Sequence, residues 1–443
     1  MRETPLGERY DSTTRHIQRM YDQQTGREWG RMSRHRTEFA VTLRALAEYL
    51  PPPPAHILDC GGGPGRYAIE LARQGYQVTL FDLSSGNLDL AREKATAAGV
   101  TLAAYEQGNA TDLSRYPNDH FDAVLLMGPL YHLLEAADRL QTLTEGRRVL
   151  KPGGPLFAAF ITRYAVMRWA AANEPQWIID HADLLEGILT TGVLPPEDEQ
   201  GQGFVAHFAH PEKVGPLCQQ AGLELQVLLA AEGLVSMIEE KVNALTGPAW
   251  DAWVALNWRV AADPTLPGGA EHMLAVAVKP RWQAVLQKVA GVLNEASVTY
   301  TVVGGTSAAL HGVPIAVQDI DIETDLAGAY RCQELLSAHV VEPVALRSSD
   351  QYRSHLGRLE IDGVLIEIMG DLHRREDTQW IPTAAATMKT VLLDGVPVRA
   401  SELEEETLAY IRRQRLDRAA TCLPSCNPER LLALLRERSL RVL

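Results

Sequence analysis

The chain has 443 residues and a net charge of −14, and 46% of its residues are hydrophobic while 22% are charged. This length favours two or three domains, and the composition excludes collagen-like, coiled-coil and largely disordered chains. The negative charge argues against an electrostatic grip on long nucleic acid, and five scattered cysteines without a disulfide framework fit a reducing, cytoplasmic compartment. No stretch approaches 18 uninterrupted apolar residues, so we expect no membrane span.

Strands alternate with helices over the first part of the chain. Residues 10–50 have helical spacing up to the prolines at 51–54, and strands are expected at 56–60, 77–81, 121–127 and 155–161, with helices between them. This alternation predicts an α/β fold with a doubly wound parallel sheet. Residues 162–210 break the rhythm with a helical, Trp-containing insert that reaches the acidic turn at 195–199, as a lid would. Strands near 204, at 223–229 and at 273–278 complete this part.

A second, smaller α/β pattern follows, so we expect two domains, over residues 1–280 and 281–443. It predicts a helix up to 295, strands at 300–303 and 320–323, a helix at 327–338, strands near 358 and 365, and terminal helices. Residues 412–441 contain eight arginines against three acids. A solvated helical face is the simpler interpretation, and an anionic partner such as tRNA is the alternative.

A glycine turn follows the first buried strand, in ILDCGGGPGRY at 57–67. Glycines here allow positive φ and a close approach of the backbone to a ligand at the carboxyl end of the strand. Asp82 ends the next strand, where a carboxylate can accept hydrogen bonds from ribose hydroxyls. These two features alone fit a nicotinamide dinucleotide and S-adenosylmethionine equally well. The turn lacks the lysine of a phosphate-binding NTPase loop.

Five segments taken together break this tie, namely ILDCGGGPGRY, LFDLS, GNATDL, FDAVLLMGPLYHL and RVLKPGG. In this order and spacing, residues 15–280 resemble the class I S-adenosylmethionine-dependent methyltransferases, which implies a Rossmann-like sheet. The resemblance implies that the glycine turn lies along the methionine part of the cofactor, Asp82 binds ribose, Asn109 lies against adenine and Met127 is near the reacting centre. Relatives often carry Asp at the Asn109 position, so Asp112 is an alternative adenine contact. The cofactor-binding residues expected in all are Asp59, Gly61, Gly62, Gly63, Gly65, Asp82, Leu83, Asn109, Ala110, Met127 and Gly128.

Tyr131 and His132 follow the fourth strand, where a base or a group that orients the acceptor would act. The alternative for His132 is packing at a helix start. The segment MGPLY at 127–131 lacks the Asn/Asp-Pro-Pro-Tyr motif of methyltransferases that act on base nitrogens, which favours a small-molecule acceptor. Aromatic side chains of the insert either line an acceptor pocket or pack a core. They are Tyr164, Trp169, Trp177, His181, Phe204, His207 and Phe208. His207 and His210 would lie on opposite faces of a strand, so we expect no zinc there.

A second glycine turn and three carboxylates occur after residue 300. Asp319 and Asp321 are two positions apart on an expected strand, so both project to one face and can chelate divalent cations, with Mg²⁺ the natural candidate. Glu367 lies in another strand-like run, where an acid among apolar residues is costly unless it has a purpose. Three carboxylates with two metals suit in-line phosphoryl chemistry.

The segments GGTSAALHG, QDIDI and LIEIMGD resemble the minimal nucleotidyltransferase superfamily over residues 282–420. The resemblance implies that Gly304, Gly305 and Ser307 hold a nucleoside triphosphate, and that Asp319, Asp321 and Glu367 bind metal and are catalytic. Relatives often have Arg and Thr shortly before the acidic pair, where this chain has Ile315 and Val317. Lys389 or residues 413–418 could supply the missing positive charge.

We therefore expect a cytoplasmic bifunctional enzyme, in which S-adenosylmethionine-dependent methyl transfer to a small molecule is joined to Mg²⁺-dependent nucleotidyl transfer. The alternative is a methyltransferase whose C-terminal domain is a non-catalytic binding or regulatory module. A membrane partner is not expected, and nucleic acid is disfavoured, with tRNA left open.

Overall fold

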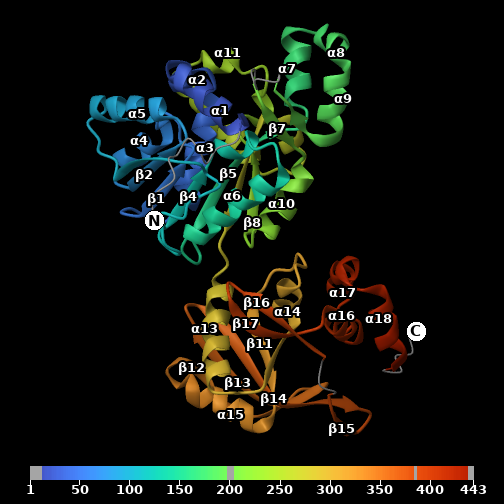
Figure 1. Cartoon of the computed structure of the whole chain (residues 1–443). Helices are drawn as coiled ribbons and strands as arrows, with labels where there is room; N and C mark the ends of the chain where they lie inside the picture. Colours follow the sequence, from blue (N-terminus) through green and yellow to red (C-terminus); the bar gives the residue numbers. More distant parts are fainter. Residues whose placement is uncertain (1–11, 197–203, 384–386, 438–443) are drawn as a thin grey trace. The chain divides into compact units, whose positions relative to one another are not determined.

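The computed structural model describes residues 12–196, 204–383 and 387–437, and the chain forms two compact units, residues 1–279 and 280–443 (Figure 1). The last part of the expected acidic turn, residues 197–199, lies outside the described residues, as do Arg438 and Arg441. Within the described ranges, no helix is both long and apolar enough to cross a membrane.

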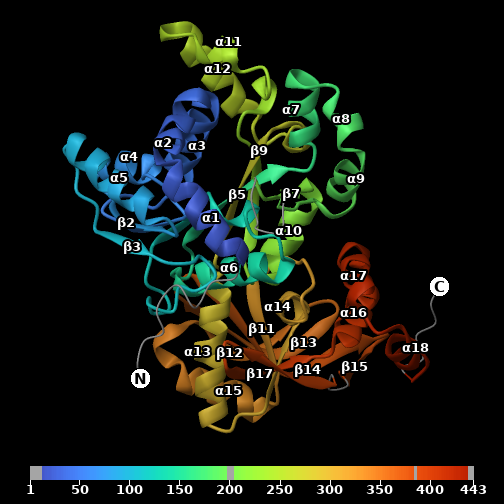
Figure 2. The same ribbon diagram turned by 45° about the horizontal axis from the view of Figure 1, so that its top comes forward.

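The first unit is an α/β layer structure with three helices at its N-terminus. Figure 2 shows α7, α8 and α9 gathered as a helical group at one side of this unit. Its helices are α1 (Ser12–Gln23), α2 (Thr25–Arg34), α3 (Arg36–Tyr49), α4 (Arg66–Arg73), α5 (Ser85–Ala97), α6 (Ala136–Val149), α7 (Ala165–Asn173), α8 (Trp177–Asp180), α9 (Ala182–Thr191), α10 (Pro211–Gln220), α11 (Glu240–Asn243) and α12 (Gly247–Val260). Its strands are β1 (His56–Cys60), β2 (Gln77–Asp82), β3 (Ala104–Gln107), β4 (Ala123–Leu126), β5 (Pro155–Thr162), β6 (Val193–Leu194), β7 (Ala206–Ala209), β8 (Glu224–Ala230) and β9 (His272–Val278).

The sheet of the first unit has the order β3-β2-β1-β4-β5, and these strands are parallel. These five parallel strands confirm the expectation of a doubly wound, Rossmann-like sheet, and their carboxyl ends lie along one edge of it. The parallel arrangement continues from β5 to β7, but β9 departs from it and pairs antiparallel with both β5 and β8. After β8 the chain passes through α11 and α12 before it enters β9. β9 then runs back alongside β8 in the opposite direction.

Both faces of this sheet are buried, as a doubly wound fold requires. Leu58 and Val124 belong to one buried cluster, while their neighbours Ile57 and Leu125 belong to another. Because successive side chains of a strand point to opposite faces, each strand contributes to both cores. The helices on the two sides fix where the strand ends lie, and hence the loops that follow them.

The second unit is a smaller α/β domain. Its helices are α13 (Arg281–Glu295), α14 (Gly304–Leu310), α15 (Leu326–Leu335), α16 (Leu403–Arg412), α17 (Leu416–Cys422) and α18 (Pro428–Glu437). Its strands are β10 (Tyr300–Val303), β11 (Asp319–Thr324), β12 (Val340–Ser348), β13 (Tyr352–Ile361), β14 (Val364–Glu376), β15 (Gln379–Pro382), β16 (Met388–Leu393) and β17 (Val396–Ser401). The main path of the sheet is β12-β13-β14-β11-β10-β17-β16.

Alternation along β11 separates a buried face from a polar one. Ile320 and Ile322 are fully buried in the core beneath α13 and α15, whereas Asp319 and Asp321 point to the other face. β14 pairs in parallel with β11, with Glu367 directly opposite Asp321. The expected neighbouring strand for Glu367 is therefore present.

The expected elements differ from the structure in three further places. Residues 10–50 form three helices instead of one, with breaks at Gln24 and His35. The strands β12, β15, β16 and β17 were not expected, because long hairpins with polar edges lack a clear apolar pattern. His210 lies outside β7, where it caps α10, so the expectation that His207 and His210 share a strand is wrong.

Candidate functional site

A cavity that is open to solvent, with about 1020 Å³ of empty space including its mouth, lies at the carboxyl edge of the first sheet. Its walls are the loops that follow β1, β2, β3 and β4, together with side chains of α1 and α2. Of the expected cofactor residues, all except Gly65 line it. The lining residues from the loops and strands include Asp59, Gly61, Gly62, Gly63, Asp82, Leu83, Asn109, Ala110, Met127, Gly128, Tyr131 and His132.

The glycine turn after β1 is a cradle that a side chain would fill. Gly61 has a φ of +73°, and a Cβ there would lie 2.6 Å from the ring of Pro129. A Cβ on Gly62 would lie 2.5 Å from the carboxylate of Asp59. Only glycine therefore lets the backbone reach the cavity at these two positions.

Asp59 is a buried carboxylate at the wall of this cavity. Neither of its oxygens has a hydrogen-bond partner among the described residues, and its exposed fraction is 0%. Burial and the neighbouring Asp82 raise the pKa of Asp59 to about 7. A buried acid without a partner is costly, and a ligand with a cationic group would satisfy it.

Asp82 organises the loop that follows β2. Its two oxygens accept hydrogen bonds from the backbone N–H groups of Gly63 and Ser84, each at 2.8 Å. Burial raises the pKa of Asp82 to about 6, although both backbone hydrogen bonds oppose that rise. The carboxylate thus ties the glycine turn to the second strand and lines the cavity between them.

Sequence reasoning missed the contribution of the N-terminal helices. Tyr21 on α1 and both Glu28 and Arg31 on α2 line the cavity. These helices lie against α5 (Figures 1 and 2). Their only signal in the sequence was a helical pattern, which does not show what the polar face covers.

His132 is held at both ring nitrogens. Its Nδ1 lies 2.9 Å from the carbonyl oxygen of Val205, and its Nε2 lies 2.6 Å from the hydroxyl of Tyr21. Burial lowers the pKa of His132 to about 4, so the ring is neutral at pH 7. We therefore assign the tautomer in which Nδ1–H donates to Val205 and Nε2 accepts from Tyr21. His132 thus orients the Tyr21 hydroxyl, while burial raises the pKa of Tyr131.

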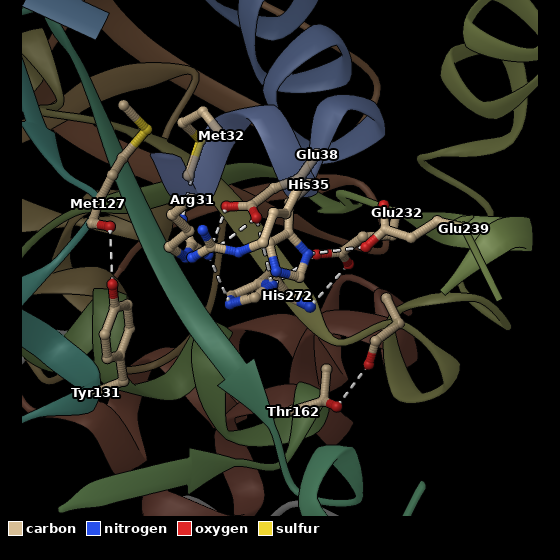
Figure 3. A network of polar contacts seen from close by, with 12 residues as sticks. Arg31, Met32, His35, Glu38, Met127, Tyr131, Thr162, Glu232, Glu239 and His272 are labelled. Atoms are coloured by element: carbon tan, nitrogen blue, oxygen red, sulfur yellow. Dashed lines mark hydrogen bonds and ion pairs between the residues drawn. The ribbon is translucent and has the colours of Figure 1, made fainter. Parts of the chain in front are cut away.

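Arg31 is anchored by a buried network of charges (Figure 3). Its Nη2 donates to both carboxylate oxygens of Glu38, at 3.0 and 2.9 Å, and lies 3.1 Å from His272 Nε2. His272 Nδ1 lies 2.5 Å from Glu232, whose other oxygen accepts the His272 backbone N–H at 2.9 Å. The network couples α2 and α3 to the start of β9, so it fixes the helices that cover the cavity.

Replacing Glu232 by alanine is expected to destabilise the chain by about 3–5 kcal/mol, because it removes the buried acceptor of both the His272 ring Nδ1–H and the His272 backbone N–H. The free energy of unfolding from urea denaturation, followed by circular dichroism, measures this. The exposed Glu240 provides the control, since Glu240→Ala should change stability by less than about 0.5 kcal/mol. Equal stabilities of the two variants would show that the network contributes nothing.

Stability is also expected to fall at alkaline pH. Burial lowers the pKa of His272, but the carboxylates of Glu38 and Glu232 outweigh burial and the opposing Arg31, and raise it to about 9. A raised pKa means that the contribution, about 3 kcal/mol, is complete below pH 6.5 and is lost as the pH rises through 9. Urea denaturation between pH 6 and pH 10 tests this. In Glu232→Ala the slope should be smaller, because one of the two carboxylates is gone.

Several expected residues lie outside the cavity. Gly65 is the N-cap residue before α4, with a φ of +79°, and does not line the wall. Asp112 is exposed, and its carboxylate accepts the Ser114 N–H, so the alternative adenine contact is not favoured. The aromatic residues of the insert do not line the cavity either, although the Phe204 ring lies 5.6 Å from that of His132.

The carboxylates of Asp319, Asp321 and Glu367 meet on the polar face of the second sheet. An oxygen of each lies within 4.8 Å of the others. Burial, Asp319 and Glu367 raise the pKa of Asp321 to about 7. Divalent cations prefer such oxygen ligands and would relieve this repulsion, so the donor set fits a metal. Arg358 Nε donates to Glu367 at 2.7 Å and orients it.

Side chains of the second unit already contact the second glycine turn. The Gly304 N–H donates to Glu406 at 2.9 Å, and a Cβ on Gly304 would overlap the Asp321 carboxylate. The Ser307 hydroxyl is fully buried and donates to the Ser401 carbonyl at 2.9 Å. Gly304 therefore lets Asp321 approach the turn, whereas Ser307 points into the core and away from a ligand.

Each of the two units is similar to a known protein family. Residues 57–154 match the model of a methyltransferase domain, and residues 285–419 match that of aminoglycoside-2''-adenylyltransferase. The tRNA 5-carboxymethoxyuridine methyltransferase of Escherichia coli K12 is 34% identical over 125 residues, 28% of this chain and 46% of that protein. The ubiquinone biosynthesis O-methyltransferase of Cereibacter sphaeroides is 31% identical over 175 residues, 36% of this chain and 68% of that protein.

A solved structure assigned as a nucleotidyltransferase, from Thermotoga maritima, has 37% sequence identity, covers 32% of this chain and 91% of its own, and gives a TM-score of 0.30. The chain spans a little under half the length of the Escherichia coli relative, 46%. The chain belongs to the class I S-adenosylmethionine-dependent methyltransferases through its first unit, and its second unit is a nucleotidyltransferase-type domain.

Proposed function

We propose that this chain transfers the methyl group of S-adenosylmethionine to a small-molecule acceptor, and that its second unit transfers a nucleotidyl group from a nucleoside triphosphate with a divalent cation. The observation that carries the first part is the unpartnered, buried carboxylate of Asp59 beside the glycine cradle in the cavity. The proposal includes Mg²⁺ as the cation and a cytoplasmic location.

The residues of the cavity fit S-adenosylmethionine. The turn at 61–63 would lie along its methionine part, Asp82 and Leu83 would bind the ribose, and Asn109 with Ala110 would lie against adenine. Asp59 and Glu28 match its positive groups, and Arg31 matches its carboxylate. When bound, the cofactor supplies an activated methyl group for in-line displacement. The protein's part is to orient the acceptor near Met127 and Gly128 and to exclude water.

The acceptor side of the cavity is formed by Tyr21, Tyr131 and His132. Because the neutral His132 ring accepts a hydrogen bond from the Tyr21 hydroxyl, the pair presents an oriented phenol oxygen to the cavity. Such an oxygen can accept a hydrogen bond from an acceptor hydroxyl or amine and aim its lone pair at the methyl group. Tyr21 and His132 therefore act as the orienting pair in this proposal, and Tyr131 lines the same cavity.

In the second unit, Asp319, Asp321 and Glu367 would hold the divalent cations. A divalent cation held by these residues would supply Lewis-acid stabilisation of the phosphate charge that develops during nucleotidyl transfer. Arg358 keeps Glu367 in place through the 2.7 Å hydrogen bond, and Gly304 lets the backbone pass close to Asp321. Three half-buried acids gathered on one face support a catalytic role over a purely binding module.

The Escherichia coli relative modifies a tRNA nucleoside, so tRNA is the competing acceptor class. The net charge of −14 favours a small molecule, because binding to long nucleic acid requires a basic surface. Retention of the chain on tRNA at raised salt would reverse this preference.

Calorimetric titration tests the proposal. The full chain is titrated with S-adenosylmethionine, and then with ATP, CTP, GTP and UTP, each with and without Mg²⁺. We expect S-adenosylmethionine to bind without metal and at least one nucleotide to bind only with it. Binding of S-adenosylmethionine without any nucleotide response would restrict the proposal to methyl transfer.

A further inference from the structure

A histidine and two carboxylates form a cluster outside the cavity of the first unit. His35 lies between α2 and α3, Glu239 directly precedes α11, and Glu271 directly precedes β9. Each offers one ligand atom, and these atoms all lie within 4.8 Å of one another. His35 Nδ1 is 2.8 Å from Glu239 Oε1, and the two side chains point toward one another (Figure 3). None of the three residues lines the cavity, so the proposed function does not use this cluster.

Glu239 has an unpartnered carboxylate oxygen in this cluster. Its side chain is only 9% exposed, and its Oε2 has no hydrogen-bond partner among the described residues. Because Oε2 belongs to the same carboxylate as Oε1, it lies beside the His35 imidazole. A buried carboxylate oxygen without a partner is costly, and a bound cation would satisfy it.

Glu271 adds a second negative charge beside Glu239. In the part of the chain that the structure describes, neither carboxylate forms an ion pair with a lysine or an arginine, and Glu239 pairs with His35. Arg31 on α2 is paired with Glu38 at 2.9 Å. The backbone of Glu271 is fixed, because its carbonyl accepts the Thr162 N–H at 2.9 Å. The two negative charges match those of a divalent cation.

The segment that carries Glu239 is held against His35 by contacts outside the cluster. Asn243, at the end of α11, donates to the Arg34 carbonyl at 2.7 Å and accepts a hydrogen bond from the Thr37 hydroxyl at 3.1 Å. These contacts fix α11 to the residues on both sides of His35. The ligand atoms are therefore gathered by the fold itself, and an ion would meet a preformed site.

We propose that His35, Glu239 and Glu271 bind a divalent transition-metal cation, with Zn²⁺ as the best match, and that the ion cross-links the α2–α3 corner to the starts of α11 and β9. An imidazole nitrogen together with carboxylate oxygens suits Zn²⁺, whereas Mg²⁺ prefers oxygen ligands alone. Two ligand atoms of a tetrahedral Zn²⁺ site lie roughly 3.4 Å apart, so small side-chain rotations bring these three to the ion. The inference is independent of methyl transfer and of nucleotidyl transfer.

Calorimetric titration with Zn²⁺ tests the site in the full chain that carries Asp319→Asn and Asp321→Asn, so that the acids of the second unit do not compete for the ion. We expect one Zn²⁺ to bind to this background. His35→Gln and Glu271→Gln, each added to it, should weaken binding by about 100-fold, because each removes one of the three ligands. In thermal denaturation, Zn²⁺ should raise the melting temperature of the background more than that of either variant.

His181→Gln and Glu240→Gln are the matched controls, because both residues are exposed, belong to the first unit and lie outside the cluster. Glu271→Gln separates binding from folding, since it keeps the side-chain volume and should leave the metal-free melting temperature unchanged. If the background binds no Zn²⁺, or if His35→Gln and Glu271→Gln bind it as tightly as the controls, the site is wrong. If the controls lose affinity to the same extent, the ion binds elsewhere and the site is also wrong.

Discussion

A chain that carries both Asp319→Asn and Asp321→Asn is expected to lose metal-dependent nucleotide binding by about 100-fold or more, because two charged ligands of the cation are removed. S-adenosylmethionine binding should not change. Since burial and mutual repulsion raise the pKa values of both acids, their neutral replacements should not lower the melting temperature. Calorimetry with each nucleotide and Mg²⁺, together with thermal denaturation, measures both effects.

The control for this double change removes the same charge elsewhere on the same sheet. Glu360 on β13 and Asp371 on β14 are exposed, so Glu360→Gln with Asp371→Asn should leave nucleotide binding as in the wild type. If both double variants bind the nucleotide as tightly as the wild type, Asp319 and Asp321 have no metal role. If both lose affinity, the loss reflects a general electrostatic effect.

The local parts of both sites could be predicted from the sequence because they depend on neighbouring residues. The alternation DIDIET fixes Asp319 and Asp321 on one face of β11, whatever the rest of the fold does. Likewise, the turn after β1 needs glycine at Gly61 because of its positive φ and the nearby Pro129. Such constraints are written in a few consecutive residues.

What the sequence did not reveal depends on packing between distant segments. Tyr21 reaches His132 across 111 positions, and Arg31 reaches His272 across 241. The direction of Ser307 is likewise set by Ser401, which lies 94 positions away on another strand. No local pattern records these contacts, so a helix can be expected at α1 and α2 without any indication that it closes a cavity.

The residue with the largest expected effect in the first unit is Asp82. Asp82→Ala removes the carboxylate proposed to bind the ribose and leaves the N–H groups of Gly63 and Ser84 without an acceptor. Affinity for S-adenosylmethionine should fall by about 100-fold or more, since hydrogen bonds to a charged group are lost and the glycine turn is released. Calorimetric titration with S-adenosylmethionine gives the dissociation constant.

Asp82→Ala should also cost a few kcal/mol of stability, so folding must be measured alongside binding. Asp82→Asn keeps the side-chain volume and one acceptor oxygen, and a tenfold loss of affinity in a variant with a normal melting temperature would separate binding from folding. Asp112→Ala is the matched control, because Asp112 is exposed and outside the cavity. If S-adenosylmethionine binds Asp82→Asn as tightly as the wild type, or if Asp112→Ala loses affinity instead, the ribose assignment is wrong.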